Sequence, residues 1–151
     1  MGIIEKMRLD GKHIFVTGGA RGIGKSVATA FAEAGADLAI VDVDIDEAEK
    51  TAKELADKTG RKVIAVKTDV TEPEQVDAMV EKVVSELGGL EAAFCNAGIC
   101  INEPADEMTF EHWKKVIDIN LTGVFLTATA AGKYMLNHGG GSIINTASMS
   151  G

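Results

Sequence analysis

Glycines at positions 18, 22 and 24 lie close together in the segment TGGARGIG (residues 17–24), directly after the apolar run HIFV. Gly18 suits a tight turn, Gly22 would let a diphosphate approach the backbone, and Gly24 would let a helix pack close to a sheet. Unpaired N–H groups and the positive dipole at the start of that helix would favour an anion. The spacing is G-x-x-x-G-x-G rather than the common G-x-G-x-x-G, and a tight turn without a ligand is the alternative.

A carboxylate, Asp42 in the segment VDVDID, stands about twenty residues further on. An acid at the end of the second strand of such a unit accepts hydrogen bonds from both adenosine ribose hydroxyls and repels a 2′-phosphate. Arg21 acts in the opposite direction, because a guanidinium attracts a 2′-phosphate. The two side chains together predict NAD rather than NADP. The alternative for Asp42 is an ordinary solvated acid in an acidic run.

The elements that would position these residues alternate along the chain. Strands are predicted at 12–18, 37–42, 62–69, 90–98 and 141–148, and helices at 22–34, 44–58, 73–88 and 109–136. Asp44 with Glu47, and Thr71 with Glu74, have the spacing of capping boxes. Near-continuous apolar strands separated by helices indicate an α/β fold of three layers, a Rossmann-type doubly wound parallel sheet. We expect residues 1–151 to form one NAD(P)-binding domain.

Composition restricts the class of protein. The chain has 151 residues, 46% of them hydrophobic and 25% charged, with a formal net charge of −8. This acidic balance argues against nucleic acid or an anionic membrane as a partner. No signal-peptide core or long apolar run occurs, so a cytoplasmic location is expected. The three histidines and the two cysteines, Cys95 and Cys100, lack the spacing of metal ligands, so no metal is expected.

The variant glycine spacing resembles the cofactor loop of the short-chain dehydrogenase/reductase family, and further motifs follow in that family's order. Asp69-Val70 stands where the family contacts adenine, and Asn96-Ala97-Gly98 follows the fourth strand. INLTGVF contains Asn120, and GSIINTASMSG contains Ser148. The resemblance covers the whole chain. It implies a cofactor-binding set of Gly18, Arg21, Gly22, Ile23, Gly24, Asp42, Asp69, Val70, Asn96, Ala97 and Gly98.

The same resemblance implies two catalytic roles. Ser148 would donate a hydrogen bond to the substrate oxygen, with a helix cap or turn as the alternative. Asn120 would hold a water in a proton relay, with a satisfied core amide as the alternative. In the family, a Tyr-x-x-x-Lys pair beyond the serine takes the alcohol proton. The only tyrosine here, Tyr134, precedes Ser148 and has no lysine four residues later.

Relative to the family, the sheet is therefore truncated after its fifth strand and the domain is incomplete at its C-terminus. We expect a polypeptide that ends at Gly151 to bind NAD without measurable turnover. The last residues, TASMSG, are similar to those of polyol dehydrogenases and ketose reductases. That similarity implies a small-molecule alcohol or ketone substrate, such as a sugar alcohol.

The predicted helix at 109–136 is apolar almost all round, which indicates burial on more than one side. The family pairs this helix with a partner subunit, usually within a tetramer, so a homo-oligomer is expected. Two alternative functions would use the same sequence features without catalysing a reaction. One is a stand-alone dinucleotide-binding module, and the other is a protein that assembles through this helix.

Overall fold

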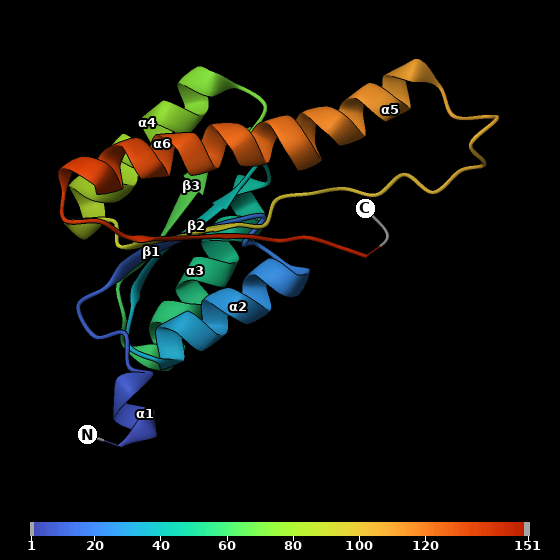
Figure 1. Ribbon diagram of the computed structural model, residues 1–151. Helices are drawn as coiled ribbons and strands as arrows, with labels where there is room; N and C mark the ends of the chain where they lie inside the picture. Colours follow the sequence, from blue (N-terminus) through green and yellow to red (C-terminus); the bar gives the residue numbers. More distant parts are fainter. Residues whose placement is uncertain (1, 150–151) are drawn as a thin grey trace.

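The apolar runs of the sequence form a parallel five-stranded sheet in the computed structural model, which describes residues 2–149 (Figure 1). The order of the strands is β3-β2-β1-β4-β5, and every neighbouring pair is parallel. The predicted doubly wound sheet is confirmed. The strands are β1 His13–Thr17, β2 Asp37–Asp42, β3 Val63–Lys67, β4 Ala92–Cys95 and β5 Ser142–Asn145.

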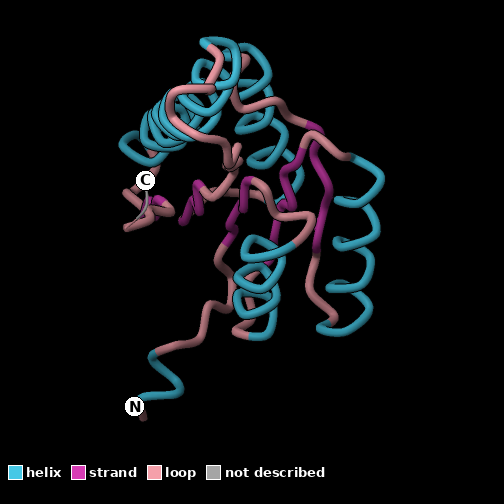
Figure 2. The backbone as a smooth tube through the Cα atoms, turned by 90° about the vertical axis from the view of Figure 1, so that its right-hand side faces the viewer, coloured by secondary structure: helices cyan, strands magenta, loops and turns pink. Residues whose placement is uncertain are grey.

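Helices cover both faces of the sheet, as the views in Figures 1 and 2 show. α2 and α3 lie on one face, and α4 and α6 lie on the other. Within residues 2–149, no helix is long and apolar enough to cross a membrane. The helical segments are α1 Ile3–Lys6, α2 Gly22–Glu33, α3 Ile45–Thr59, α4 Pro73–Leu87, α5 Phe110–Ile117, η1 Asp118–Gly123 and α6 Val124–Asn137.

The core divides into two layers because successive strand residues point to opposite faces. Phe15 packs in the layer beneath α4 and α6, whereas Ile14 and Val16 pack in the layer beneath α2 and α3. All three side chains are at most 1% exposed. A strand buried on both faces explains why the sequence shows continuous apolar runs rather than alternation.

The long helix predicted at 109–136 is confirmed, because helical residues run without interruption from Phe110 to Asn137 and Thr109 is the N-cap. The structure divides it into α5, the π-helical segment η1 and α6. A π-helix has one extra residue per hydrogen-bonded turn, which shifts the side chains that follow. Hydrophobic periodicity indicates a helix but does not distinguish these two hydrogen-bond patterns.

The two predicted capping boxes have different outcomes. Asp44 is the N-cap of α3 and accepts a hydrogen bond from the Glu47 backbone N–H at 3.2 Å, so this helix start is confirmed. The box at Thr71 is wrong, because Glu72 is the N-cap of α4 and no side chain caps it. The Thr71 hydroxyl instead donates to Asp69 Oδ1 at 2.7 Å.

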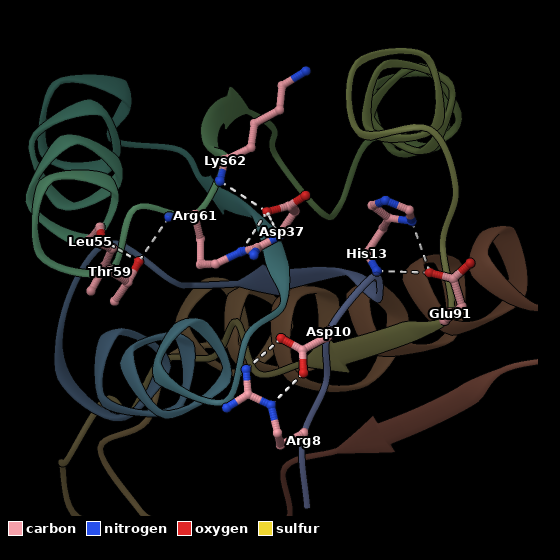
Figure 3. Close-up of polar contacts among 9 residues, drawn as sticks. All are labelled: Arg8, Asp10, His13, Asp37, Leu55, Thr59, Arg61, Lys62 and Glu91. Carbon is pink, nitrogen blue, oxygen red and sulfur yellow. Dashed lines mark hydrogen bonds and ion pairs between the residues drawn. The ribbon is translucent and has the colours of Figure 1, made fainter. Parts of the chain in front are cut away.

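Charged side chains fix the edge of the sheet at which the strands begin (Figure 3). Asp37, the first residue of β2, accepts hydrogen bonds from Arg61 Nη2 at 2.8 Å and from the Lys62 backbone N–H at 2.9 Å. Glu91 accepts from the His13 backbone N–H at 2.7 Å, which joins the starts of β1 and β4. The strands end at the opposite edge of the sheet, and the predicted site residues lie there.

Candidate functional site

The predicted site residues lie at the carboxyl edge of the sheet. The chain leaves β1 toward β2 on one side, while β4 pairs with β1 on the other side. This is the topological switch point of a doubly wound sheet, where a crevice forms outside the strand ends. The glycine loop after β1 and the turn Asn96–Gly98 after β4 therefore lie next to each other.

The loop glycines at positions 18, 22 and 24 have different surroundings. Gly18 has φ +62°, and a Cβ there would lie 3.0 Å from Ala97 Cα. A Cβ on Gly24 would lie 2.1 Å from the Gly18 carbonyl oxygen. Gly22 has φ +57°, and a Cβ there would meet nothing within 4 Å. Two glycines therefore allow close packing, whereas the third faces open space.

The start of α2 is suited to an anion. Its N-cap is Arg21, and no side chain caps the helix. Ile23 in the first turn is 66% exposed. The first backbone N–H groups of a helix have no partner within the helix, and the helix dipole makes this end positive. The open space over Gly22 lies at this end of the helix, so a phosphate could reach these groups.

Asp42 ends β2 beside this loop. Its Oδ2 accepts a hydrogen bond from the Ala20 backbone N–H, and its Oδ1 accepts one from the Asp44 backbone N–H, both at 3.2 Å. Each carboxylate oxygen keeps further acceptor capacity. The side chain of Arg21 is directed to Asp44, with Nη2 2.5 Å from Oδ2. The guanidinium therefore already has a carboxylate partner.

Asp69 and Val70 follow β3. Asp69 Oδ1 accepts hydrogen bonds from both the backbone N–H and the hydroxyl of Thr71, and the Asp69 backbone N–H donates to Gln75 Oε1 at 2.9 Å. Val70 is 6% exposed, and a Cβ on Gly123 would lie 2.6 Å from its Cγ2. Val70 thus packs against η1 and ties this loop to the segment that carries Asn120.

The turn after β4 is tied to β1 through the buried hydroxyl of Thr17. Thr17 Oγ1 accepts hydrogen bonds from the backbone N–H groups of Asn96 at 2.9 Å and Ala97 at 3.0 Å. The Asn96 amide donates to the Thr17 carbonyl at 3.3 Å. Burial raises the pKa of the adjacent Cys95 thiol to about 11, so this thiol is neutral.

Asn120 is exposed, and its amide contacts the turn after β4. Its Oδ1 accepts a hydrogen bond from the Ile99 backbone N–H at 2.9 Å, and its Nδ2 donates to the Ile99 carbonyl at 2.8 Å. A Cβ on Gly98 would lie 3.3 Å from Asn120 Oδ1. The structure thus brings η1 against the Asn96–Gly98 turn.

Ser148 is exposed and follows the end of β5. Asn145 pairs with Cys95 in the sheet register, so the chain leaves β5 beside the Asn96–Gly98 turn. The structure joins Gly18, Gly24, Asn96 and Ala97 by direct contacts, and it brings Asn120 to Gly98. Ser148 is placed on the same edge of the sheet.

Three threonines that support the site were not predicted from the sequence. Thr17 holds the turn after β4, and the buried Thr51 donates from α3 to the Ala20 carbonyl at 2.7 Å. Thr146 donates to Asn96 Oδ1 at 3.0 Å. Thr17 directly precedes the glycine loop, which is the only sequence signal among the three. The other two have ordinary positions in a helix and after a strand.

Comparisons with known proteins agree with this geometry. The short chain dehydrogenase family profile matches residues 12–151. The D-threitol dehydrogenase of Mycolicibacterium smegmatis is 40% identical over 93% of this chain and 54% of its own length. The galactitol 2-dehydrogenase of Agrobacterium fabrum is 41% identical over 96% of this chain and 56% of its own length.

The solved structure of a short-chain type dehydrogenase/reductase from Mycobacterium marinum superposes with a TM-score of 0.96. Its sequence is 44% identical, and the match covers 100% of this chain and 61% of that one. The chain therefore spans little more than half the length of the relatives that it matches. From its glycine loop, its strand order and these matches, the chain belongs to the short-chain dehydrogenase family.

Proposed function

We propose that the protein is an NAD(P)-dependent oxidoreductase that transfers hydride between a nicotinamide cofactor and a secondary alcohol or ketone. The observation that carries the proposal is the open approach over Gly22 at the uncapped start of α2, beside the Asp42 carboxylate. A diphosphate would meet backbone N–H groups there, and the carboxylate would meet a ribose. When bound, the nicotinamide supplies the hydride acceptor or donor.

NAD is the preferred cofactor in this proposal. Asp42 retains acceptor capacity for ribose hydroxyls beyond its two backbone partners. A 2′-phosphate would meet the negative charge of Asp42, and also that of Asp44 nearby. Arg21, the cation that would favour NADP, is paired with Asp44. A 2′-phosphate would therefore share this guanidinium with the Asp44 carboxylate.

Ser148 and Asn120 are the residues to which we assign the chemistry. Ser148 would donate a hydrogen bond to the substrate oxygen, and removal of one such donor typically lowers the rate by about 10²–10³-fold. Asn120 uses one donor and one acceptor position on Ile99. An amide has a second hydrogen and a second lone pair, which suffice to hold a water. The exposure of Asn120 leaves room for that water.

The substrate class that we propose is a polyol or the corresponding ketose. Two similar relatives are named for the oxidation of D-threitol and galactitol, and a third is the sorbose reductase of Candida albicans, 36% identical over 99% of this chain. All three names specify polyhydroxylated substrates. The Tyr-x-x-x-Lys pair of the family has no counterpart within residues 1–151, so we expect turnover only from a polypeptide that carries it.

We also propose that the protein is a homo-oligomer. Large apolar side chains on α5, η1 and α6 are exposed in the single chain, including Trp113 at 55%, Leu121 at 64% and Phe125 at 64%. If such side chains form one apolar patch, that patch is typical of a protein interface. Light scattering at micromolar concentration checks this expectation, and a monodisperse monomer would contradict it.

Cofactor binding is the direct test of the proposal. Calorimetric titration should show NAD binding that is tighter than NADP binding. Asp42→Ala should weaken NAD binding by about tenfold, because a charged acceptor lost from the ribose contributes roughly 1.5–3 kcal/mol, part of which water replaces. The preference for NAD over NADP should narrow at the same time.

Asp46→Ala is the matched control, because it removes the same charge from an exposed position in the first turn of α3. Its NAD affinity should equal that of the original chain. Binding of neither cofactor would refute the proposal, and tighter NADP binding would refute the assigned preference. For the chemistry, an NADH absorbance assay with several polyols should show turnover from a polypeptide that carries the Tyr-x-x-x-Lys pair, and Ser148→Ala should lower that turnover.

A further inference from the structure

The side chain of Asn96 stands between the glycine loop and the end of β5. Its Nδ2 is 3.3 Å from the Thr17 carbonyl oxygen and 3.5 Å from the Gly18 carbonyl oxygen. Both oxygens only accept hydrogen bonds, so the amide nitrogen must face them. The amide oxygen of Asn96 then faces the opposite way, where Thr146 Oγ1 lies 3.0 Å from it.

Thr146 is the residue directly after β5. Its backbone N–H donates to the Cys95 carbonyl at 3.1 Å, so the pairing of β5 with β4 extends to this position. Because Asn96 Oδ1 has no proton, the Thr146 hydroxyl must be the donor in their hydrogen bond. The backbone contact and the side-chain contact together fix Thr146 against the turn after β4.

These contacts form one continuous connection from Gly18 through Asn96 to Thr146. The Gly18 carbonyl oxygen also faces Gly24, where a Cβ would lie 2.1 Å from it. Its direction therefore decides how the glycine loop meets the start of α2. At the other end of the connection, Thr146 lies two residues before Ser148.

We propose that Thr146 is a positioning residue that holds the Asn96 amide in one orientation and thereby couples the glycine loop to the strand end that carries Ser148. Removing its hydroxyl leaves the half-buried Asn96 oxygen without this donor. The amide is then held only by its contacts with the Thr17 carbonyl at 3.3 Å and the Gly18 carbonyl at 3.5 Å, so the Gly18 carbonyl has a less steady partner. The consequence for cofactor binding rests on the function proposed above, but the coupling within the chain does not.

Thr146→Val tests the proposal, because valine has nearly the shape of threonine and lacks the hydroxyl. Thr146→Ser keeps the hydroxyl and should behave as the original chain. Ser142→Ala is the matched control, since Ser142 is an exposed residue of β5, the strand that Thr146 directly follows. Circular dichroism verifies that each variant is folded, and Thr146→Ala replaces the valine variant if that one is not.

Two measurements are made on each folded variant. The first is hydrogen exchange of the Asn96 side-chain amide and of the backbone amides of residues 18–24 without ligand. We expect exchange about three- to tenfold faster in Thr146→Val, the size expected for one hydrogen bond. The second is NAD affinity, which should fall by about three- to tenfold in Thr146→Val and recover in Thr146→Ser.

Unchanged exchange in residues 18–24 of Thr146→Val would overturn the proposal, as would an equal effect of Ser142→Ala. Failure of Thr146→Ser to restore exchange would also overturn it, because the hydroxyl would then not be the cause. If the original chain binds no NAD, the proposed function is wrong. The exchange measurement still decides the coupling in that case, so the two failures are distinguishable.

Discussion

Gly24→Ala should destabilise the protein, although alanine is the better helix former. Gly24 lies in the first turn of α2, and a Cβ there would be 2.1 Å from the Gly18 carbonyl oxygen and 2.9 Å from Asn96 Nδ2. Ordinary van der Waals contact begins at 3.4 Å. The obstructing atoms belong to a backbone carbonyl and to a hydrogen-bonded amide, so neither can move away without breaking contacts of its own.

The size of the stability loss in Gly24→Ala follows from two opposing effects. An added methyl group in a packed site costs about 1–3 kcal/mol, and an obstructing backbone atom places Gly24 at the upper end. Alanine returns at most about 1 kcal/mol of helix propensity. The expected net loss of about 2 kcal/mol lowers the melting temperature of a domain of this size by about 4–8 °C. Thermal unfolding followed by circular dichroism measures this shift.

Gly132→Ala is the matched control in another helix. Gly132 lies in α6, and a Cβ there would meet only Ile143 Cδ1 at 3.6 Å, which is ordinary contact. Helix propensity should then dominate, and the variant should gain up to about 1 kcal/mol. The two substitutions are chemically identical and should have opposite signs. A melting temperature of Gly24→Ala at or above that of the original chain would refute the packing argument.

Two further outcomes are expected. Gly22→Val should fold, at a cost of about 1–2 kcal/mol for a side chain at positive φ, and should lose NAD binding. Calorimetry on the folded variant measures NAD affinity, and unchanged affinity would mean that the loop is only a turn. Burial raises the pKa of Cys95 from 9.0 to about 11, so the unfolded chain releases this proton first and stability should fall by about 2–3 kcal/mol between these pH values. Denaturant unfolding across this range should show a smaller loss in Cys95→Ala; equal slopes would contradict the assignment.

The sequence predicts the fold because the features that specify it are local. Apolar runs bounded by glycines mark the strands, and Asp44 marks the start of α3 at its observed N-cap. The π-helical segment η1 does not have a local cause. It accompanies the contacts of Asn120 with Ile99 and of Gly123 with Val70, which join distant parts of the chain. Periodicity within 109–136 carries no information about these partners.

The site shows the same division. The glycines and Asp42 stand out in the sequence because clustered glycines after an apolar run, and an acid at the end of the next one, are uncommon. The hydroxyls that hold the site together do not stand out, because threonine is frequent in strands and at their ends. Thr17, Thr51 and Thr146 acquire their roles only when the fold brings separate strands, loops and helices side by side.

Arg21 shows why the effect of one side chain on cofactor preference cannot be judged from the sequence without its neighbours. There, Arg21 and Asp42 are opposing indications for the 2′ position of a ribose. In the structure, Arg21 is paired with Asp44, and the backbone N–H of Asp44 donates to Asp42. The guanidinium of Arg21 thus forms an ion pair with Asp44, which belongs to the same acidic run as Asp42. In the proposed complex, a 2′-phosphate would share the Arg21 guanidinium with Asp44 and would also face two carboxylates. We therefore expect Arg21 to favour NADP less than its charge alone implies.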